Sequence, residues 1–212
     1  IIHKVIGSDA IVRLSRIIRK VSENQIPQWN QHFPKPAPSI DWKYEAKTNL
    51  SKVVYFPSCI CRMMGPSKGS HTSHAGAVHK VLNRAGYQYI HPEGVEGMCC
   101  GVAFDSKGFP SQAGRKTEEL KEALLKTSNN GEYPILCETS PCVQRLNHEL
   151  SELPIYDPVS FAGEFLIDQL ELQQLEETVL IHPTCSNRKA GHVAKMQAIA
   201  EKCSKDVVLP HT

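Results

Sequence analysis

Val53-Val54-Tyr55-Phe56-Pro57-Ser58-Cys59 is an apolar run that ends in a proline, a hydroxyl residue and a cysteine. The same pattern returns at Val179-Leu180-Ile181-His182-Pro183-Thr184-Cys185. In each copy a polar turn leads into a helical segment and then into a strand that stops at Pro92 or Pro210. β-Branched and aromatic residues bounded by proline predict a strand. The repetition predicts two units built in the same way.

Further strand and helix patterns alternate between and after these two runs. Strands are predicted at 87–90, 133–136 and 207–209, and helices at 71–84, 110–127, 142–150, 158–170 and 189–203. Strands separated by helices indicate βαβ units and a mainly parallel sheet. We therefore predict an α/β fold with two pseudo-repeats, the second one truncated.

The first 48 residues differ from the rest. Apolar residues on one face predict an amphipathic helix over 9–23, and the prolines between 27 and 38 predict an extended linker. We expect three parts: helix and linker (1–48), first repeat (49–176) and the start of a second repeat (177–212). The chain lacks an initiator Met, and the second double cysteine would lie past Thr212, so we expect a fragment of a longer protein.

The bulk composition indicates a globular chain. Hydrophobic residues make up 41% and charged residues 22% of the 212 residues. The net charge of +2 does not indicate a nucleic-acid partner. There is no secretory signal and no apolar run near the roughly 20 residues that span a bilayer. We expect a cytoplasmic protein whose basic first helix makes at most peripheral contact with the inner face of a membrane.

Eight cysteines are many for this length, and most follow predicted strands. Cys59 ends the first strand, Cys99-Cys100-Gly101 follows the second, and Cys137 and Cys142 follow the third. The carboxyl ends of parallel strands meet at one edge of the sheet. Clustered thiolates select iron–sulfur, zinc or copper(I), so the sequence predicts a metal or redox site there.

In order and spacing, Cys59, Cys99-Cys100-Gly101 and Cys137 resemble the CCG cysteine-rich domain. That domain occurs in heterodisulfide reductase, in glycerol-3-phosphate dehydrogenase and in the iron–sulfur subunits of glycolate oxidase. The segments 99–109, 138–142 and 182–189 resemble the C-terminal part of FAD-linked D-lactate dehydrogenases. The resemblance implies a [4Fe–4S] cluster, including the non-cubane type, and places FAD only in an upstream domain.

The resemblance also implies a ligand set. Metal ligands are expected at Cys59, Cys99, Cys100 and Cys142, with Cys137 as a fifth cofactor-binding thiol. Thr139 stands where the family has the cysteine partner of Cys142. Cys185 is expected to open a second, incomplete site. Other candidates receive structural interpretations: Cys61 as a spare thiol, Cys203 as a buried free thiol, and His71 and His74 as ordinary surface histidines.

The function implied is that of an electron-transfer module in an FAD-dependent 2-hydroxyacid dehydrogenase of the D-lactate type. The FAD-binding and ferredoxin-like domains of the parent chain would be its partners, a quinone or cytochrome the acceptor, and the fragment alone would be inactive. Two alternatives stay open: cluster-based disulfide chemistry like that of heterodisulfide reductase, and a zinc-bound or metal-free interaction domain. No G-x-G-x-x-G follows a strand, so we expect this chain to bind no flavin.

Overall fold

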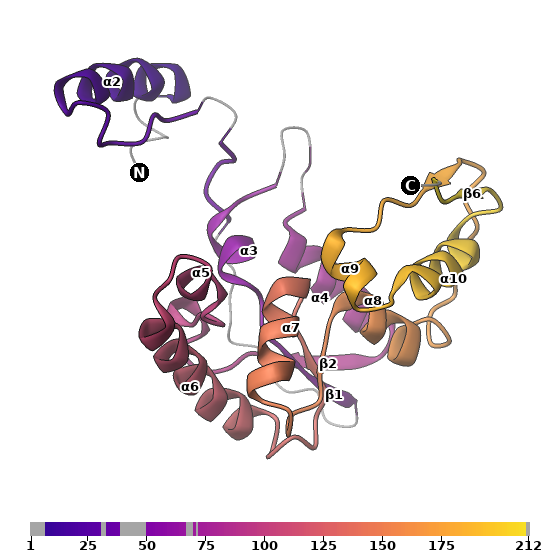
Figure 1. Ribbon diagram of the computed structural model, residues 1–212. Coiled ribbons are helices and arrows are strands. Elements are labelled where there is room, and N and C mark those ends of the chain that lie inside the picture. Colours follow the sequence, from indigo (N-terminus) through magenta and orange to yellow (C-terminus); the bar gives the residue numbers. More distant parts are fainter. Residues whose placement is uncertain (1–6, 31–32, 39–49, 67–69, 71, 211–212) are drawn as a thin grey trace.

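The computed structural model describes residues 7–30, 33–38, 50–66, 70 and 72–210. Its main sheet has four parallel strands in the order β2-β1-β3-β4; β1 and β2 are labelled in Figure 1. The strands are β1 (Ser51–Tyr55), β2 (Tyr87–Ile90), β3 (Ile135–Leu136) and β4 (Ile155–Tyr156). This arrangement confirms the predicted α/β class with a parallel sheet.

Strand β1 lies between β2 and β3, and Val54 marks its register. Val54 is level with Ile90 of β2 on one side and with Ile135 of β3 on the other. Ile135 in turn is level with Ile155 of β4. Strand β4 was not predicted, because two residues directly after Pro154 carry too little pattern to reveal a strand without their pairing partner.

Side chains of β1 alternate between two hydrophobic layers, as the period of a strand requires. Val54 and Phe56 join one layer, which helices α6 and α7 complete. Val53 and Tyr55 join the other, completed by α4, α8 and η2. These helices are α4 (His74–Arg84), α6 (Pro110–Thr127), α7 (Ser140–Glu149), α8 (Pro158–Phe161) and η2 (Ala162–Leu166). The sheet is therefore covered on both faces, as expected of a parallel sheet.

Several helix boundaries differ from the sequence prediction, and the helix expected over 189–203 begins only at Val193. The helix expected over 158–170 is a single α-helical turn, α8, that continues as the π-helix η2. The helix expected from position 71 begins at His74, after Ser73, whose side chain accepts a hydrogen bond from the Gly76 amide at 3.1 Å. His71 lies outside the described residues.

The second unit repeats the element order of the first. It consists of β5 (Val179–Leu180), α9 (Cys185–Lys189), α10 (Val193–Cys203) and β6 (Val207–Val208), with β5 and β6 parallel. The first unit has β1, the short helix α3 (Cys59–Met63), α4 and β2 in the same order. Ser58 and Thr184 cap α3 and α9 in the same way, each side chain accepting a backbone N–H.

Polar contacts attach the second unit to the first. The Gln144 amide donates to the backbone oxygen of Ser186 at 3.0 Å. His192, at the start of α10, reaches back to Asp157 and Ser160 at the start of α8. The His192 and Asp157 side chains are only 12% and 5% exposed, so these contacts form a buried junction between the units.

Helix α2 (Ser8–Val21) lies away from the sheet and its covering helices (Figure 1). Its apolar face remains largely exposed, at Leu14, Ile17, Ile18 and Val21. The following linker touches the body through backbone hydrogen bonds, from the Gly65 amide to Lys35 O at 2.7 Å and from the Ala37 amide to Met63 O at 3.0 Å. Among the described residues, no helix combines the length and apolar character needed to cross a membrane.

Candidate metal centre

Four chain segments bring cysteines to the carboxyl edge of the main sheet. Cys59 is the first residue of α3, directly after β1. Cys99 and Cys100 lie between η1 (Val95–Gly97) and α5 (Val102–Asp105). Cys137 follows β3, and Cys142 lies in the first turn of α7. The edge predicted from the order of the strands is the edge where these thiols meet.

The sulfur atoms of these residues are close neighbours. The Cys100 thiol donates to the Cys142 sulfur at 2.9 Å. Cys100, Cys137 and Cys142 are buried in one core cluster, with at most 4% of each residue exposed. Cys59 and Cys99 are half-buried, and the Cys99 sulfur accepts the Gly101 amide at 3.4 Å. Three of the five thiols are thus buried, and the other two lie closer to solvent.

Proximity and burial raise the pKa of three of these thiols, those of Cys59, Cys100 and Cys142. Burial first, then the charges of Cys99 and Cys100, raise the pKa of the Cys59 thiol. The hydrogen bond to Cys142, followed by burial, raises the pKa of Cys100. For Cys142 the hydrogen bond from Cys100 lowers the pKa, but Cys137, burial and the charge of Cys59 outweigh it and the net shift is upward. A bound cation reverses this balance, because it stabilises the thiolate form and the thiol proton is released to solvent.

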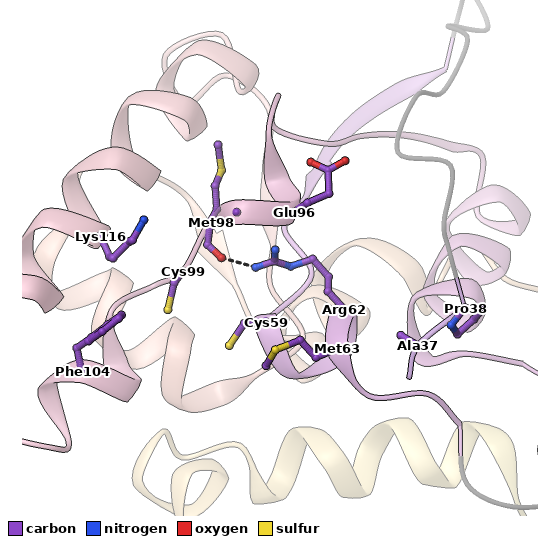
Figure 2. Close-up of a pocket in the computed structure, with 11 residues that line it drawn as sticks. Ala37, Pro38, Cys59, Arg62, Met63, Glu96, Met98, Cys99, Phe104 and Lys116 are labelled. Atoms are coloured by element: carbon purple, nitrogen blue, oxygen red, sulfur yellow. Dashed lines mark hydrogen bonds between the residues drawn. The ribbon is translucent and has the colours of Figure 1, made fainter. Parts of the chain in front are cut away.

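Arg62 ties the two half-buried cysteine segments together. Its guanidinium donates to the backbone oxygens of Val95 and Met98, just before Cys99, and its Nε donates to Pro57 O at 3.1 Å, just before Cys59. Figure 2 shows the Arg62–Met98 contact beside the Cys59 and Cys99 sulfurs. The guanidinium charge partly offsets the upward shift in the pKa of Cys59.

The turn at Cys99-Cys100-Gly101 is held against α6 and α7. Thr117 Oγ1 of α6 donates to Cys100 O at 3.1 Å, and Arg145 Nε of α7 donates to the same oxygen at 3.1 Å. Gly101 has φ +87°, and a Cβ there would lie 2.5 Å from Ala113 O. The close neighbour that requires a glycine at this position is therefore the backbone of α6.

A cavity of about 590 Å³ opens beside the half-buried thiols. Its lining includes Cys59, Arg62, Met63, Cys99, Phe104 and Lys116 (Figure 2). Arg62 and Lys116 bring two positive charges to this lining and Glu96 brings one negative charge, beside apolar and sulfur-containing side chains. The net positive charge suits a group with net negative charge. The cavity is also lined by Ala37 and Pro38 of the linker.

The other cysteines lie apart from this group. Cys185 starts α9 and is exposed, and Cys203 is half-buried at the end of α10. Cys61 belongs to the opposite layer of the sheet, packed against the cluster that contains Tyr55. Burial and the neighbouring Glu138 carboxylate raise the pKa of the Cys61 thiol to about 12.

The side chains that hold the cysteine segments were not predicted. Arg62, Arg145 and Thr117 act on backbone oxygens of other segments, so no local pattern reveals them. A basic residue three positions after Cys59 was the one available signal, and it is equally typical of a solvated surface.

A serine–histidine–aspartate arrangement occurs at the junction between the units. His192 Nε2 lies 3.1 Å from Ser160 Oγ, and His192 Nδ1 lies 3.0 Å from Asp157 Oδ2. Asp157 Oδ1 already accepts the Val159 and Ser160 amides that cap α8. Those amides are therefore occupied and offer no oxyanion hole. We assign this trio to packing between the units.

Comparisons of the chain with known protein families, with curated proteins and with solved structures find no significant match.

The differences in exposure predict an order of thiol modification. In the reduced, metal-free chain we expect iodoacetamide to label Cys185 first and Cys100, Cys137 and Cys142 last, because alkylation requires access to the sulfur. Pulse labelling followed by peptide mass spectrometry measures the order. Early labelling of Cys137, which is 0% exposed, would contradict the burial of this thiol.

Proposed function

We propose that this chain is an iron–sulfur electron-transfer module, with Cys59, Cys99, Cys100 and Cys142 as ligands and Cys137 as a fifth thiol. The observation that carries the proposal is the meeting of five thiols from four segments, with Cys100 and Cys142 in sulfur–sulfur contact at 2.9 Å. Soft thiolates in such number are the donors that iron–sulfur clusters use.

The surroundings also fit a negatively charged group with thiolate ligands. Arg62 lies between the two half-buried cysteine segments, and Lys116 lines the cavity. The pKa values of the Cys100 and Cys142 thiols are raised in the free chain, so a bound cation favours their deprotonation. When bound, a cluster supplies one-electron transfer. The chain's own part is to hold the ligands, supply compensating charge and limit the access of water.

We further propose that the module serves a flavin-dependent 2-hydroxyacid dehydrogenase of the D-lactate type, in the cytoplasm. This step rests on the resemblance of the cysteine segments to that family. In this proposal, electrons come from FAD held upstream in the same protein, through a ferredoxin-like part, and go to a quinone or cytochrome. Cluster-based disulfide chemistry is the second candidate, because the cavity beside Cys59 and Cys99 is open to a ligand.

Anaerobic reconstitution with iron and sulfide tests the proposal. We expect the reduced chain to take up iron and to gain a broad visible absorption, and we expect Cys100→Ser to lose both because it removes a buried ligand. Cys99→Ser removes a half-buried ligand and should have the same effect at lower risk to folding. Cys203→Ser, remote from the site, is the matched control and should bind iron like the wild type.

Two results would count against the iron–sulfur assignment. One is no iron above background in the folded wild-type chain. The other is equal iron in Cys203→Ser, Cys99→Ser and Cys100→Ser. Zinc uptake without iron would instead favour the interaction-domain alternative. Reduction of a heterodisulfide by the reconstituted chain would favour the second candidate over electron transfer to a quinone.

A further inference from the structure

Three metal-ligand side chains meet on the side of β1 opposite to the thiol group. The ligand atoms of Cys61, His74 and Glu138 all lie within 4.8 Å of one another. Cys61 packs against the layer of Tyr55, whereas Cys100, Cys137 and Cys142 belong to the layer of Val54. Cys61 and the three buried thiols therefore belong to opposite layers of the sheet.

Each of the three side chains is placed by a different element. Cys61 lies within α3, and its amide donates to the Ser58 cap at 3.3 Å. His74 is the first residue of α4 and is exposed. Glu138 directly follows Cys137 at the end of β3. Residues far apart in sequence thus converge because β1 and β3 are adjacent.

The two oxygens of the Glu138 carboxylate differ in their hydrogen bonding. Its Oε1 accepts the Ser58 amide at 2.8 Å and the Ser58 hydroxyl at 3.2 Å. Its Oε2 is buried and has no well-formed hydrogen bond among the described residues, although the Cys61 thiol interacts with the carboxylate. A buried carboxylate oxygen without a partner is costly, and the neighbouring Cys61 thiol is only a weak donor. A cation at this oxygen removes the penalty.

We propose that Cys61, His74 and Glu138 form a zinc site, distinct from the iron–sulfur ligands. Thiolate, imidazole and carboxylate are the three ligand types of zinc, at about 2.0–2.3 Å from the ion. Tetrahedral coordination at those distances needs ligand separations of somewhat under about 4 Å, so the observed trio closes by a small side-chain movement. The exposed side of His74 leaves the fourth position to water.

The zinc site would fix the framework of the neighbouring thiol group. Glu138 is next to Cys137, and its partner Ser58 is next to Cys59. An ion on Glu138 and Cys61 therefore links the ends of β3 and β1 through α3, and His74 adds α4 to the link. The inference does not depend on iron at the other site.

Zinc binding by the reduced, metal-free chain tests the proposal, with zinc alone as the probe. The thiol group can also take up zinc, so the informative variants keep every cysteine. We expect His74→Asn and Glu138→Gln each to bind one zinc fewer than the wild type at saturation, or to weaken one site about tenfold or more. His148→Asn changes a histidine that is 85% exposed on α7 and should match the wild type.

Cobalt in place of zinc supplies a second readout. Cys61→Ser should remove one sulfur-to-cobalt absorption contribution that Cys203→Ser leaves intact. Glutamine at 138 keeps an acceptor for Ser58, and circular dichroism checks the fold; His74 is exposed, so His74→Asn carries the test if Glu138→Gln unfolds. Wild-type zinc stoichiometry and affinity in folded His74→Asn would overturn the proposal.

Discussion

Gly101→Ala is expected to lower the free energy of unfolding of the reduced, metal-free chain by about 3–5 kcal/mol. Gly101 has φ +87°, a conformation that L-residues adopt at a cost. An added Cβ would also lie 2.5 Å from Ala113 O and 3.0 Å from Thr117 Oγ1. Thr117 holds the Cys100 carbonyl, so the turn and α6 must separate. Urea denaturation followed by circular dichroism measures the loss.

Substitutions at two other glycines separate the cost of the positive φ from the cost of the close contact with α6. Gly108 has φ +80° with nothing within 4 Å of an added Cβ, so Gly108→Ala should cost about 1–2 kcal/mol from the backbone alone. Gly114 lies within α6, also with open space, and Gly114→Ala should stabilise by about 0.5–1 kcal/mol. If Gly101→Ala costs no more than Gly108→Ala, the close contact between the cysteine turn and α6 is wrong.

Acidification from pH 7 to pH 4 is expected to destabilise the chain through a half-buried pair of histidines, His79 and His91. His91 Nδ1–H donates to Tyr55 O at 2.8 Å, and its Nε2 lies 3.2 Å from His79 Nε2. The His79 N–H therefore donates to an unprotonated His91 nitrogen. Protonation of that nitrogen would set two N–H groups against each other, in a layer that also contains Tyr55 and Tyr89.

The pKa values of His79 and His91 determine the pH range in which stability changes, and whether it rises or falls. Burial, followed by the His91 charge, lowers the pKa of His79 from 6.5 to about 4, and burial lowers that of His91 from 6.5 to about 4 despite its bond to Tyr55 O. Between pH 6.5 and about pH 4 the unfolded chain binds more protons than the folded chain. Stability is therefore full above pH 6.5 and is lost as the pH falls toward 4. We expect about 3 kcal/mol from His91 and less from His79, which is partly exposed.

The measurement is the urea midpoint at pH 7, 6, 5 and 4.5. Other groups titrate in this range, so the informative quantity is the pH dependence relative to variants. His79→Gln/His91→Gln should show a shallower loss of stability on acidification, whereas His148→Gln should keep the wild-type slope. Equal slopes in the wild type and the double variant would show that this pair does not couple folding to protons.

The sequence predicted the α/β class and the edge where the cysteines meet, because both follow from local patterns. The run at 53–56 has a strand pattern, and a cysteine after each parallel strand must lie at the carboxyl edge. His74 and Cys61 were interpreted as a surface histidine and a spare thiol. Their convergence with Glu138 depends on the pairing of β1 with β3 and on the turn of α3 that sends Cys61 to the opposite layer, which no local pattern contains.

The pairing of β1 with β3 also sets an order of events during folding. The Ser58–Glu138 hydrogen bond joins positions 80 residues apart, whereas β1 meets β2 across the shorter segment of α3 and α4. Closing the longer loop, between β1 and β3, carries the larger entropic cost and slows the formation of that contact. Each proposed metal site takes one ligand or more from the segment after β1 and one or more from the segment after β3, whose pairing forms late. A chain growing on the ribosome therefore exposes incomplete sets of thiols until β3 has been synthesised and has docked.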